Sequence, residues 1–326
     1  SSFYGVIFIT LVTMVVGSVF APEIATLLGL SGETHTECVR YLATISITCF
    51  PLVLMPLVDQ AFIAMGSART PMILHAVMLS CNIVITPFMI HTLELGIVGA
   101  ALASNLSYFI GGSIGFWIIW KRAGATREDI QLDDQLKRIL RIGTPIALGT
   151  ISYALVYWGM LYTSISPLGP HVNAALGIGF SVLEGFTWPC FHGVEMAVAS
   201  FVGRSLGAGR PDQARRAVRL ALPLSLFLGG AASLAFYFCA DFLTGIFTQD
   251  PQVHEQAILY ATILAFSQVF VAIEALNEGV LAGAGATRTV FVLTTPLTIL
   301  RVPLAYLFAF TLGYGAAGIW WAINLT

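Results

Sequence analysis

Long apolar stretches separated by short polar turns run through the whole chain. A helix that spans a membrane needs roughly 20 apolar residues. Runs of this kind occur near residues 3–20, 41–65, 72–91, 97–120, 143–165, 174–202, 214–239, 256–281 and 290–312. A tenth run begins near residue 315 and stops at Thr326, which is too short to span. The pattern therefore predicts nine spanning helices and part of a tenth.

Composition supports this interpretation. The chain is 57% hydrophobic and 10% charged, whereas a soluble domain is about 25% charged. We therefore expect an all-α integral membrane protein that crosses the inner (plasma) membrane several times, with the lipid bilayer as its surroundings and no nucleic-acid partner. The five cysteines show no metal-ligand spacing, so we expect no metal and no cofactor.

One segment of the chain occurs twice. Asp59–Leu106 aligns without a gap on Glu278–Leu325, at one constant offset in residue number. The matches fall at turns and glycines, for example Gly66–Thr70 with Gly285–Thr289, where apolar composition does not force them. Two similar halves in an apolar chain are typical of secondary transporters.

The repeat predicts the domain organisation. The second half opens at Arg141–Pro145, and the same offset places the start of the first half about 80 residues before Ser1. We therefore expect twelve helices in two six-helix lobes, with helices three to twelve in this chain. An even number of helices returns each lobe to the same side, so the repeats are parallel. The predicted domains are an N-lobe at 1–120, a cytoplasmic linker at 121–142 and a C-lobe at 143–326.

Basic residues predict the orientation. Of the 15 Lys and Arg residues, 13 lie at 121–141, at 204–219 and at Arg69 and Arg288, all on one side of the predicted membrane. Positive residues favour cytoplasmic loops, so these segments are expected to face the cytoplasm. Arg301 differs, because it lies inside an apolar run.

Several turns resemble those of the multidrug and toxic compound extrusion (MATE) family. The stretch Val202–Pro211 reads VGRSLGAGRP and is followed by Ala214-Arg215-Arg216. Arg141–Pro145 is similar to the opening of that family's second half, and Gly279–Arg288 to its GxLxGxGxT turn. Arg301–Tyr306 and Gly318–Ala322 are similar to its eleventh and twelfth helices. The resemblance runs over essentially the whole chain.

This resemblance implies a function. Members of the family have two six-helix lobes that form a V-shaped cavity, and this cavity opens to each side of the membrane in turn. The protein is then expected to be a monomeric multidrug exporter that exchanges small amphipathic or cationic compounds for H⁺ or Na⁺. The alternative is a flippase for lipid-linked precursors from the same superfamily. We expect no enzyme activity, because the sequence contains no catalytic motif such as HExxH or GxSxG.

Charged residues inside spanning helices are the candidates for ion coupling and substrate binding, because each costs about 3 kcal/mol at the middle of a bilayer. Five are acidic, which suits a cationic substrate, and one is basic. They are Asp59, Glu184, Glu195, Glu274, Glu278 and Arg301. Glu184 and Glu195 are about three helical turns apart, and Glu274 and Glu278 about one turn, so each pair shares a helix face. The alternative for Asp59 and Glu278 is pairing with Arg69 and Arg288 near the turns.

The resemblance also implies polar and aromatic sites. Some family members hold a cation partly through a fifth-helix Asn that is followed four residues later by Asp and then Pro. Here the sequence offers Asn82, Thr86 and Pro87, and Ser104 matches the sixth-helix hydroxyl. Thr86 carries no charge, which puts a Na⁺ site near Asn82 and Ser104 in doubt. The family's helix-seven glutamate is missing, but aromatic residues that could stack on planar cations stand there, namely Tyr153, Tyr157 and Trp158.

Two further expectations concern single residues. Glu184 is far from both basic loops, so we expect an unpaired buried carboxylate that exchanges a proton for a cationic compound. Pro51, Pro56, Pro189 and Pro303 lie within predicted helices and are expected to kink them.

Overall fold

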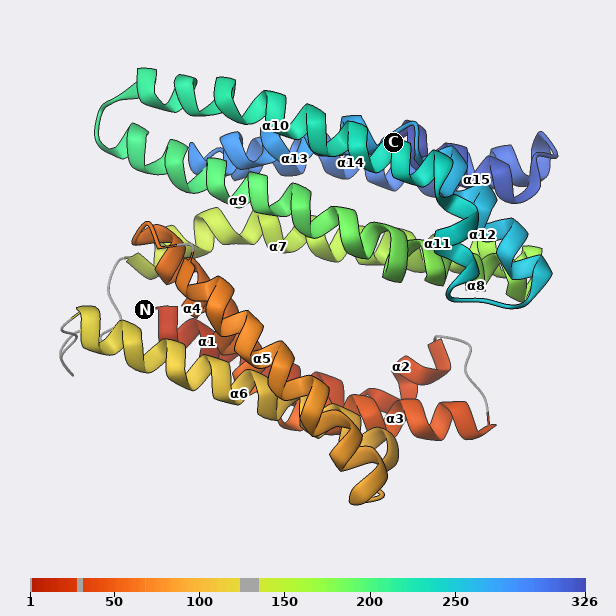
Figure 1. Ribbon diagram of the computed structural model, residues 1–326, viewed down its shortest axis with the longest axis horizontal. Coiled ribbons are helices and arrows are strands. Elements are labelled where there is room, and N and C mark those ends of the chain that lie inside the picture. The colour runs from red at the N-terminus through yellow and green to blue at the C-terminus, as the bar shows by residue number, and fades with distance from the viewer. Residues whose placement is uncertain (1, 28–31, 68, 124–134) are drawn as a thin grey trace. The chain divides into compact units, whose positions relative to one another are not determined.

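The computed structural model describes residues 2–27, 32–67, 69–123 and 135–326. These residues form helices and turns, with no strand among them, so the expected all-α membrane class is confirmed (Figure 1). Contacts divide the chain into two compact units, residues 1–139 and 140–326. The predicted linker 121–142 lies largely outside the described residues, so the predicted domain limits stay a prediction.

The first unit is a small helical bundle. Its core lies between α1, α4, α5 and α6 and contains Met55, Val58 and Phe62, which are fully buried. In chain order its helices are α1 Ser2–Val19, α2 Ala21–Leu27, α3 Gly32–Ile47, α4 Phe50–Ala64, α5 Arg69–Pro87 with the π-helical turn η1 Phe88–Thr92, and α6 Gly96–Ala123.

The second unit contains the remaining helices, and α9, α10 and α13 lie side by side in it (Figure 1). Its helices are α7 Gln135–Met160, which begins just before the boundary, η3 Leu161–Ile165, η4 Ser166–Leu168, α8 Pro170–Ile178, η5 Gly179–Glu184, α9 Gly185–Gly207, α10 Pro211–Phe238, α11 Ala240–Gly245, α12 Pro251–Leu264, α13 Gln268–Gly283, α14 Thr287–Tyr306, η6 Leu307–Thr311 and α15 Gly315–Leu325. Its largest core centres on Tyr260 and Trp320, whose rings meet edge to face at 4.8 Å.

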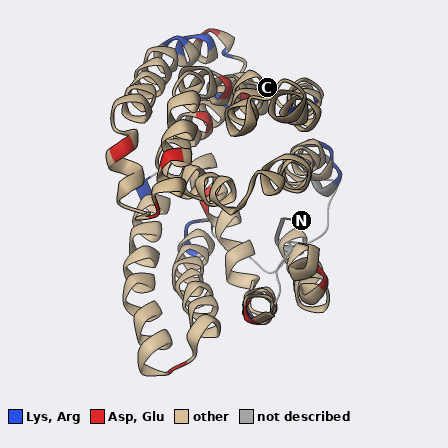
Figure 2. Ribbon diagram, turned by 90° about the vertical axis from the view of Figure 1, so that its right-hand side faces the viewer, with Lys and Arg blue, Asp and Glu red and all other residues tan. Residues whose placement is uncertain are grey.

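The spans agree with the apolar runs. Among the described residues, six helices are long and apolar enough to cross a membrane, and the number rises to nine if each of three bent pairs counts as one span. The short run at the end of the chain is α15, with 11 residues. Charged positions occupy only short, separate segments of ribbons that are otherwise uncharged (Figure 2).

Two predicted helices are not continuous. The run at 41–65 lies in α3 and α4, which meet at 54°, and the run at 256–281 lies in α12 and α13, which meet at 58°. Pro51 lies in the first turn of α4, just after the break between α3 and α4, so the predicted helix is bent beside this proline as expected, but the proline starts a new helix instead of lying inside one. Proline is tolerated in the first turn of a helix because the main-chain N–H at this position would have no acceptor within the helix. The second break, near Ala265–Ser267, contains no proline.

Several local features recur at the offset of the sequence repeat. The π-helical turns η1 and η6 begin at Phe88 and Leu307. His35 Nε2 donates to the carbonyl oxygen of Pro22 at 3.2 Å, and His254 Nε2 donates to that of Asp241 at 3.1 Å. The same offset therefore relates local structure as well as sequence, although two complete six-helix lobes stay a prediction.

Candidate functional site

Glu184 lies at the end of a π-helical turn inside the second unit. The turn η5 joins α8 to α9, and α12 packs against it. Tyr260 of α12 is fully buried and its hydroxyl donates to Glu184 Oε1. The expectation that Glu184 is unpaired is therefore wrong. A buried tyrosine hydroxyl needs a hydrogen-bond partner, and nothing in the sequence indicated that Glu184 is this partner, because the two residues lie on helices far apart along the chain.

A glycine makes this contact possible. A Cβ atom on Gly179 would lie 2.3 Å from Cε1 of Tyr260, which is too close for any side chain. Gly179 therefore allows the tyrosine ring to lie against the turn, and Trp320 of α15 covers the same ring. The hydroxyl–carboxylate pair is enclosed by packed side chains on these sides.

Arg301 of α14 lies near the same carboxylate. Its Nη1 donates to Tyr157 Oη at 3.2 Å and its Nε donates to Thr326 Oγ1 at 3.0 Å. The guanidinium also lies over the rings of Tyr153 and Tyr157, at 5.9 and 5.8 Å from their centroids. It interacts electrostatically with Glu184 and with Glu274. Within the part of the chain that the structure describes, no carboxylate lies at ion-pair distance from it.

The three predicted aromatic residues of α7 do not form one group. Tyr153 and Tyr157 contact each other, with centroids 4.7 Å apart, and Tyr157 meets Phe180 edge to face. Trp158 instead stacks on Tyr162 and is 43% exposed. It points away because it follows Tyr157 by one residue, about 100° around the helix.

A second acidic group is formed by α9 and α13. His192 Nδ1 donates to Glu195 Oε2 at 2.9 Å. Glu278 interacts electrostatically with Glu274, Glu195 and His192. Glu184 and Glu195 therefore belong to two separate groups, although they come from one continuous segment of the chain.

Close packing of α9 on α13 brings these carboxylates together. A Cβ atom on Gly279 would lie 2.4 Å from the main-chain oxygen of Glu195, and one on Gly283 would lie 2.4 Å from that of Ala199. Glycines four residues apart let two membrane helices approach closely. Because Glu278 is the neighbour of Gly279, this packing places its carboxylate near Glu195.

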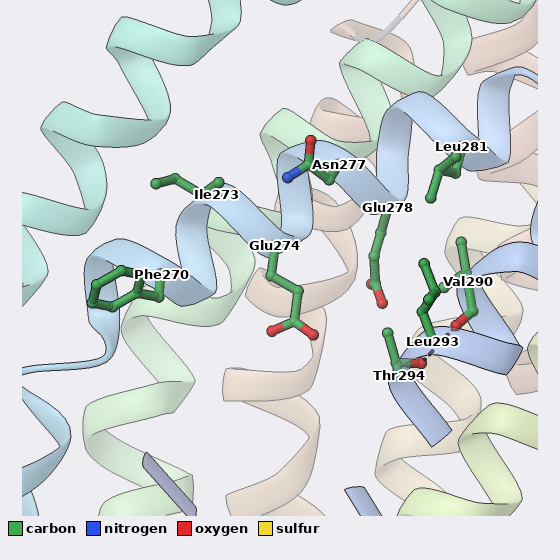
Figure 3. A pocket seen from close by; sticks show the side chains of 9 residues that line it. All are labelled: Phe270, Ile273, Glu274, Asn277, Glu278, Leu281, Val290, Leu293 and Thr294. Atoms are coloured by element: carbon green, nitrogen blue, oxygen red, sulfur yellow. Dashed lines mark hydrogen bonds between the residues drawn. The ribbon is translucent and has the colours of Figure 1, made fainter. Parts of the chain in front are cut away.

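A pocket of about 310 Å³ opens beside this group, between α13 and α14. Glu274 and Glu278 extend from the same side of α13 into it (Figure 3). Asn277 and Thr294 add polar atoms, and the remaining lining is apolar, with Phe270, Ile273, Leu281, Val290 and Leu293. An apolar wall with two carboxylates suits a compound that is both apolar and positively charged.

Asp59 and Ser104, two of the predicted residues of the first unit, have local partners. Asp59 Oδ2 accepts a hydrogen bond from His75 Nε2 at 2.9 Å, which joins α4 to α5. The alternative pairing of Asp59 with Arg69 is therefore not what the structure shows. Ser104 Oγ donates to the carbonyl oxygen of Ala100 in its own helix, and no hydrogen bond between described residues joins it to Asn82. The described residues contain no group of three His, Cys, Asp or Glu side chains that could hold a metal ion.

Sequence reasoning missed Tyr260, His75 and Thr326 as partners of the charged residues. A fully buried tyrosine in an apolar helix was the one available signal, because its hydroxyl requires a partner. The sequence could not name that partner without the packing of α12 on η5.

These features define a multi-pass helical membrane protein with ionisable groups inside its helices. Residues 145–307 match the family model MatE, and the chain belongs to this family. Residues 3–168 also match the family model described as lipid II flippase MurJ.

Individual relatives match over most of the chain. The probable multidrug resistance protein NorM of Thermotoga maritima is 29% identical over 89% of this chain. The multidrug export protein MepA of Staphylococcus aureus is 24% identical over 99% of it. The chain spans 64% of the length of the first relative and 71% of the second.

Solved structures show the same fold. An outward-facing multidrug resistance MATE family transporter matches with a TM-score of 0.84 at 22% identity, over 97% of this chain and 73% of that chain. A Vibrio cholerae MATE transporter matches with a TM-score of 0.81 at 22% identity, over 99% of this chain and 72% of that transporter.

Proposed function

We propose that the protein is a secondary active exporter that exchanges amphipathic or cationic compounds for H⁺ or Na⁺ by alternating access, as a monomer in the plasma membrane. The relatives named multidrug resistance and multidrug export proteins support the substrate class. The activity is that of a transporter, with the gradient of the coupling ion as the driving force.

The acidic pocket between α13 and α14 is the observation that carries this proposal. Glu274 and Glu278 line it, Glu195 interacts with Glu278, and the rest of its wall is largely apolar. Carboxylates at such a place attract a cation and also bind protons. A site that holds either a proton or a cationic compound, but not both, links the movement of one to the movement of the other.

Glu184 is the candidate for the proton-binding group. Its carboxylate accepts a hydrogen bond from the buried Tyr260, and Arg301 interacts with it electrostatically. Glu274 interacts with the same arginine. Glu184 and the pocket carboxylate Glu274 therefore share one charged neighbour, and this arginine connects the proton-binding group with the cation site.

The flippase of the same superfamily is the second candidate, and the match of residues 3–168 to the MurJ model favours it. A pyrophosphate lipid carries several negative charges and needs several basic side chains in its cavity. The described residues that line the pocket between α13 and α14 include two carboxylates and no basic side chain. The charges therefore favour export of cations.

The test is transport in proteoliposomes with a fluorescent organic cation such as ethidium. A Na⁺ gradient at equal pH and a pH gradient without Na⁺ are imposed separately, and one of them is expected to drive movement of the dye. The variant Glu274→Gln/Glu278→Gln is expected to lose this movement. Glu255→Gln, which changes a carboxylate of α12 outside the pocket, is the matched control. Dye movement that is the same with and without either gradient would contradict the proposal. Movement of a labelled pyrophosphate lipid between the two leaflets would favour the flippase.

A further inference from the structure

We infer that Arg301 determines the charge of the compound that the second unit accepts, by favouring singly charged over doubly charged organic cations. This inference rests on the proposed function and assigns a specificity role to one residue of the same site. Arg301 and Thr294 are seven residues apart on α14 and so share a face of that helix. Thr294 lines the pocket beside Glu274 and Glu278.

Among the described residues, no carboxylate forms an ion pair with Arg301. Its hydrogen bonds go to two neutral hydroxyl groups, those of Tyr157 and Thr326. Two aromatic rings of α7 flank the guanidinium. These contacts fix the position of the guanidinium while leaving its charge to act on its surroundings.

The charge of Arg301 acts on two carboxylates, one beside Tyr260 and one in the pocket. Arg301 interacts with Glu184, which is bound to Tyr260, and with Glu274, which lines the pocket. It therefore offsets part of the negative field that Glu274 and Glu278 produce in the pocket. A second positive charge on a bound compound is therefore attracted less strongly by the pocket carboxylates. The guanidinium also repels it. The charges of Glu184, Glu274 and Arg301 together then favour a single positive charge.

Ethidium and propidium provide the test, because they share one planar ring system and carry one and two positive charges. Binding of each dye to the purified protein is measured by fluorescence. Arg301→Gln removes the charge and keeps a hydrogen-bonding group, so it is expected to raise the affinity for propidium relative to ethidium, on the order of tenfold. Arg301→Lys keeps the charge and is expected to keep the wild-type ratio. Arg288→Gln, which removes an arginine from the first turn of the same helix, controls for the net charge of the protein.

A double variant covers the case in which Arg301→Gln fails to fold. Arg301→Gln/Glu274→Gln is compared with Glu274→Gln, which keeps Arg301, and its affinity for propidium relative to ethidium is expected to be higher than that of Glu274→Gln. An unchanged ratio in a folded Arg301→Gln protein, or equal ratios in the double variant and Glu274→Gln, overturns the role of Arg301 and leaves the proposed function standing. Failure of the wild-type protein to bind either dye overturns the proposed function as well.

Discussion

Asn105 and Asn324, which occupy equivalent positions of the sequence repeat, make the same kind of hydrogen bond in the two units. Asn105 Nδ2 donates to the carbonyl oxygen of Ile45 at 3.1 Å, and Asn324 Nδ2 donates to that of Ile263 at 2.7 Å. Each carbonyl lies just before the break of a bent helix pair. A break removes donors that a continuous helix would supply, and a side chain from another helix replaces one of them.

Loss of this hydrogen bond is expected to destabilise the second unit. Asn324→Leu removes the side-chain donor of the Ile263 carbonyl, which keeps only the main-chain N–H of Phe266 at 3.3 Å, so the free energy of unfolding is expected to fall by about 1 kcal/mol. Thermal unfolding in detergent measures the change. Leu325→Ala, at an exposed neighbouring position, is the control and is expected to have little effect. Equal stability of the Asn324→Leu and wild-type proteins would show that the break does not depend on this donor.

Glu184→Gln is expected to abolish proton-driven export while the protein still folds. Glutamine keeps the size of the side chain and can accept the hydrogen bond from Tyr260, but it does not bind or release a proton. The pH dependence of dye binding is therefore expected to flatten. Glu274→Gln is expected to weaken transport less. If Glu184→Gln left transport and its pH profile unchanged while Glu274→Gln abolished both, the coupling group would lie on α13.

Tyr260→Phe tests the partner of that carboxylate separately. It removes the hydroxyl and keeps the ring that packs against Gly179 and Trp320. Because Glu184 then loses a hydrogen bond that favours its charged form, the pH profile of transport is expected to move to higher pH. Tyr237→Phe, at an exposed position of α10, is the control. A profile identical to wild type would mean that the hydroxyl does not tune Glu184.

Gly279→Ala is expected to force α9 and α13 apart. The added methyl group meets the main chain of Glu195, which cannot rotate away as a side chain could. The free energy of unfolding is therefore expected to fall by about 1–3 kcal/mol. Gly230→Ala in α10 is the matched control, because nothing lies within 4 Å of the added atom and alanine favours a helix. Comparable unfolding temperatures for the two variants would argue against close main-chain contact.

The sequence predicted the helical membrane class and the positions of the spans, because apolar runs and turns are local features. It did not predict the bend at Ala265–Ser267, since no proline or polar cluster marks it. It also selected Glu184, Glu195, Glu274, Glu278 and Arg301, because charge in an apolar run stands out. The sequence could not identify the partners of Glu184 and Arg301, since Tyr260 and Tyr157 come from helices distant in sequence.

The contact of α9 with α13 has a mechanical consequence. Where main chain touches main chain at Gly279 and Gly283, no side chain remains between the helices to rearrange, so sliding or tilting of one against the other meets immediate steric resistance. The two helices would then move as one rigid body in the proposed transport cycle. The spacing between Glu195 and Glu278 would stay constant, and the quantity that changes during the cycle would be the access of water to this pair.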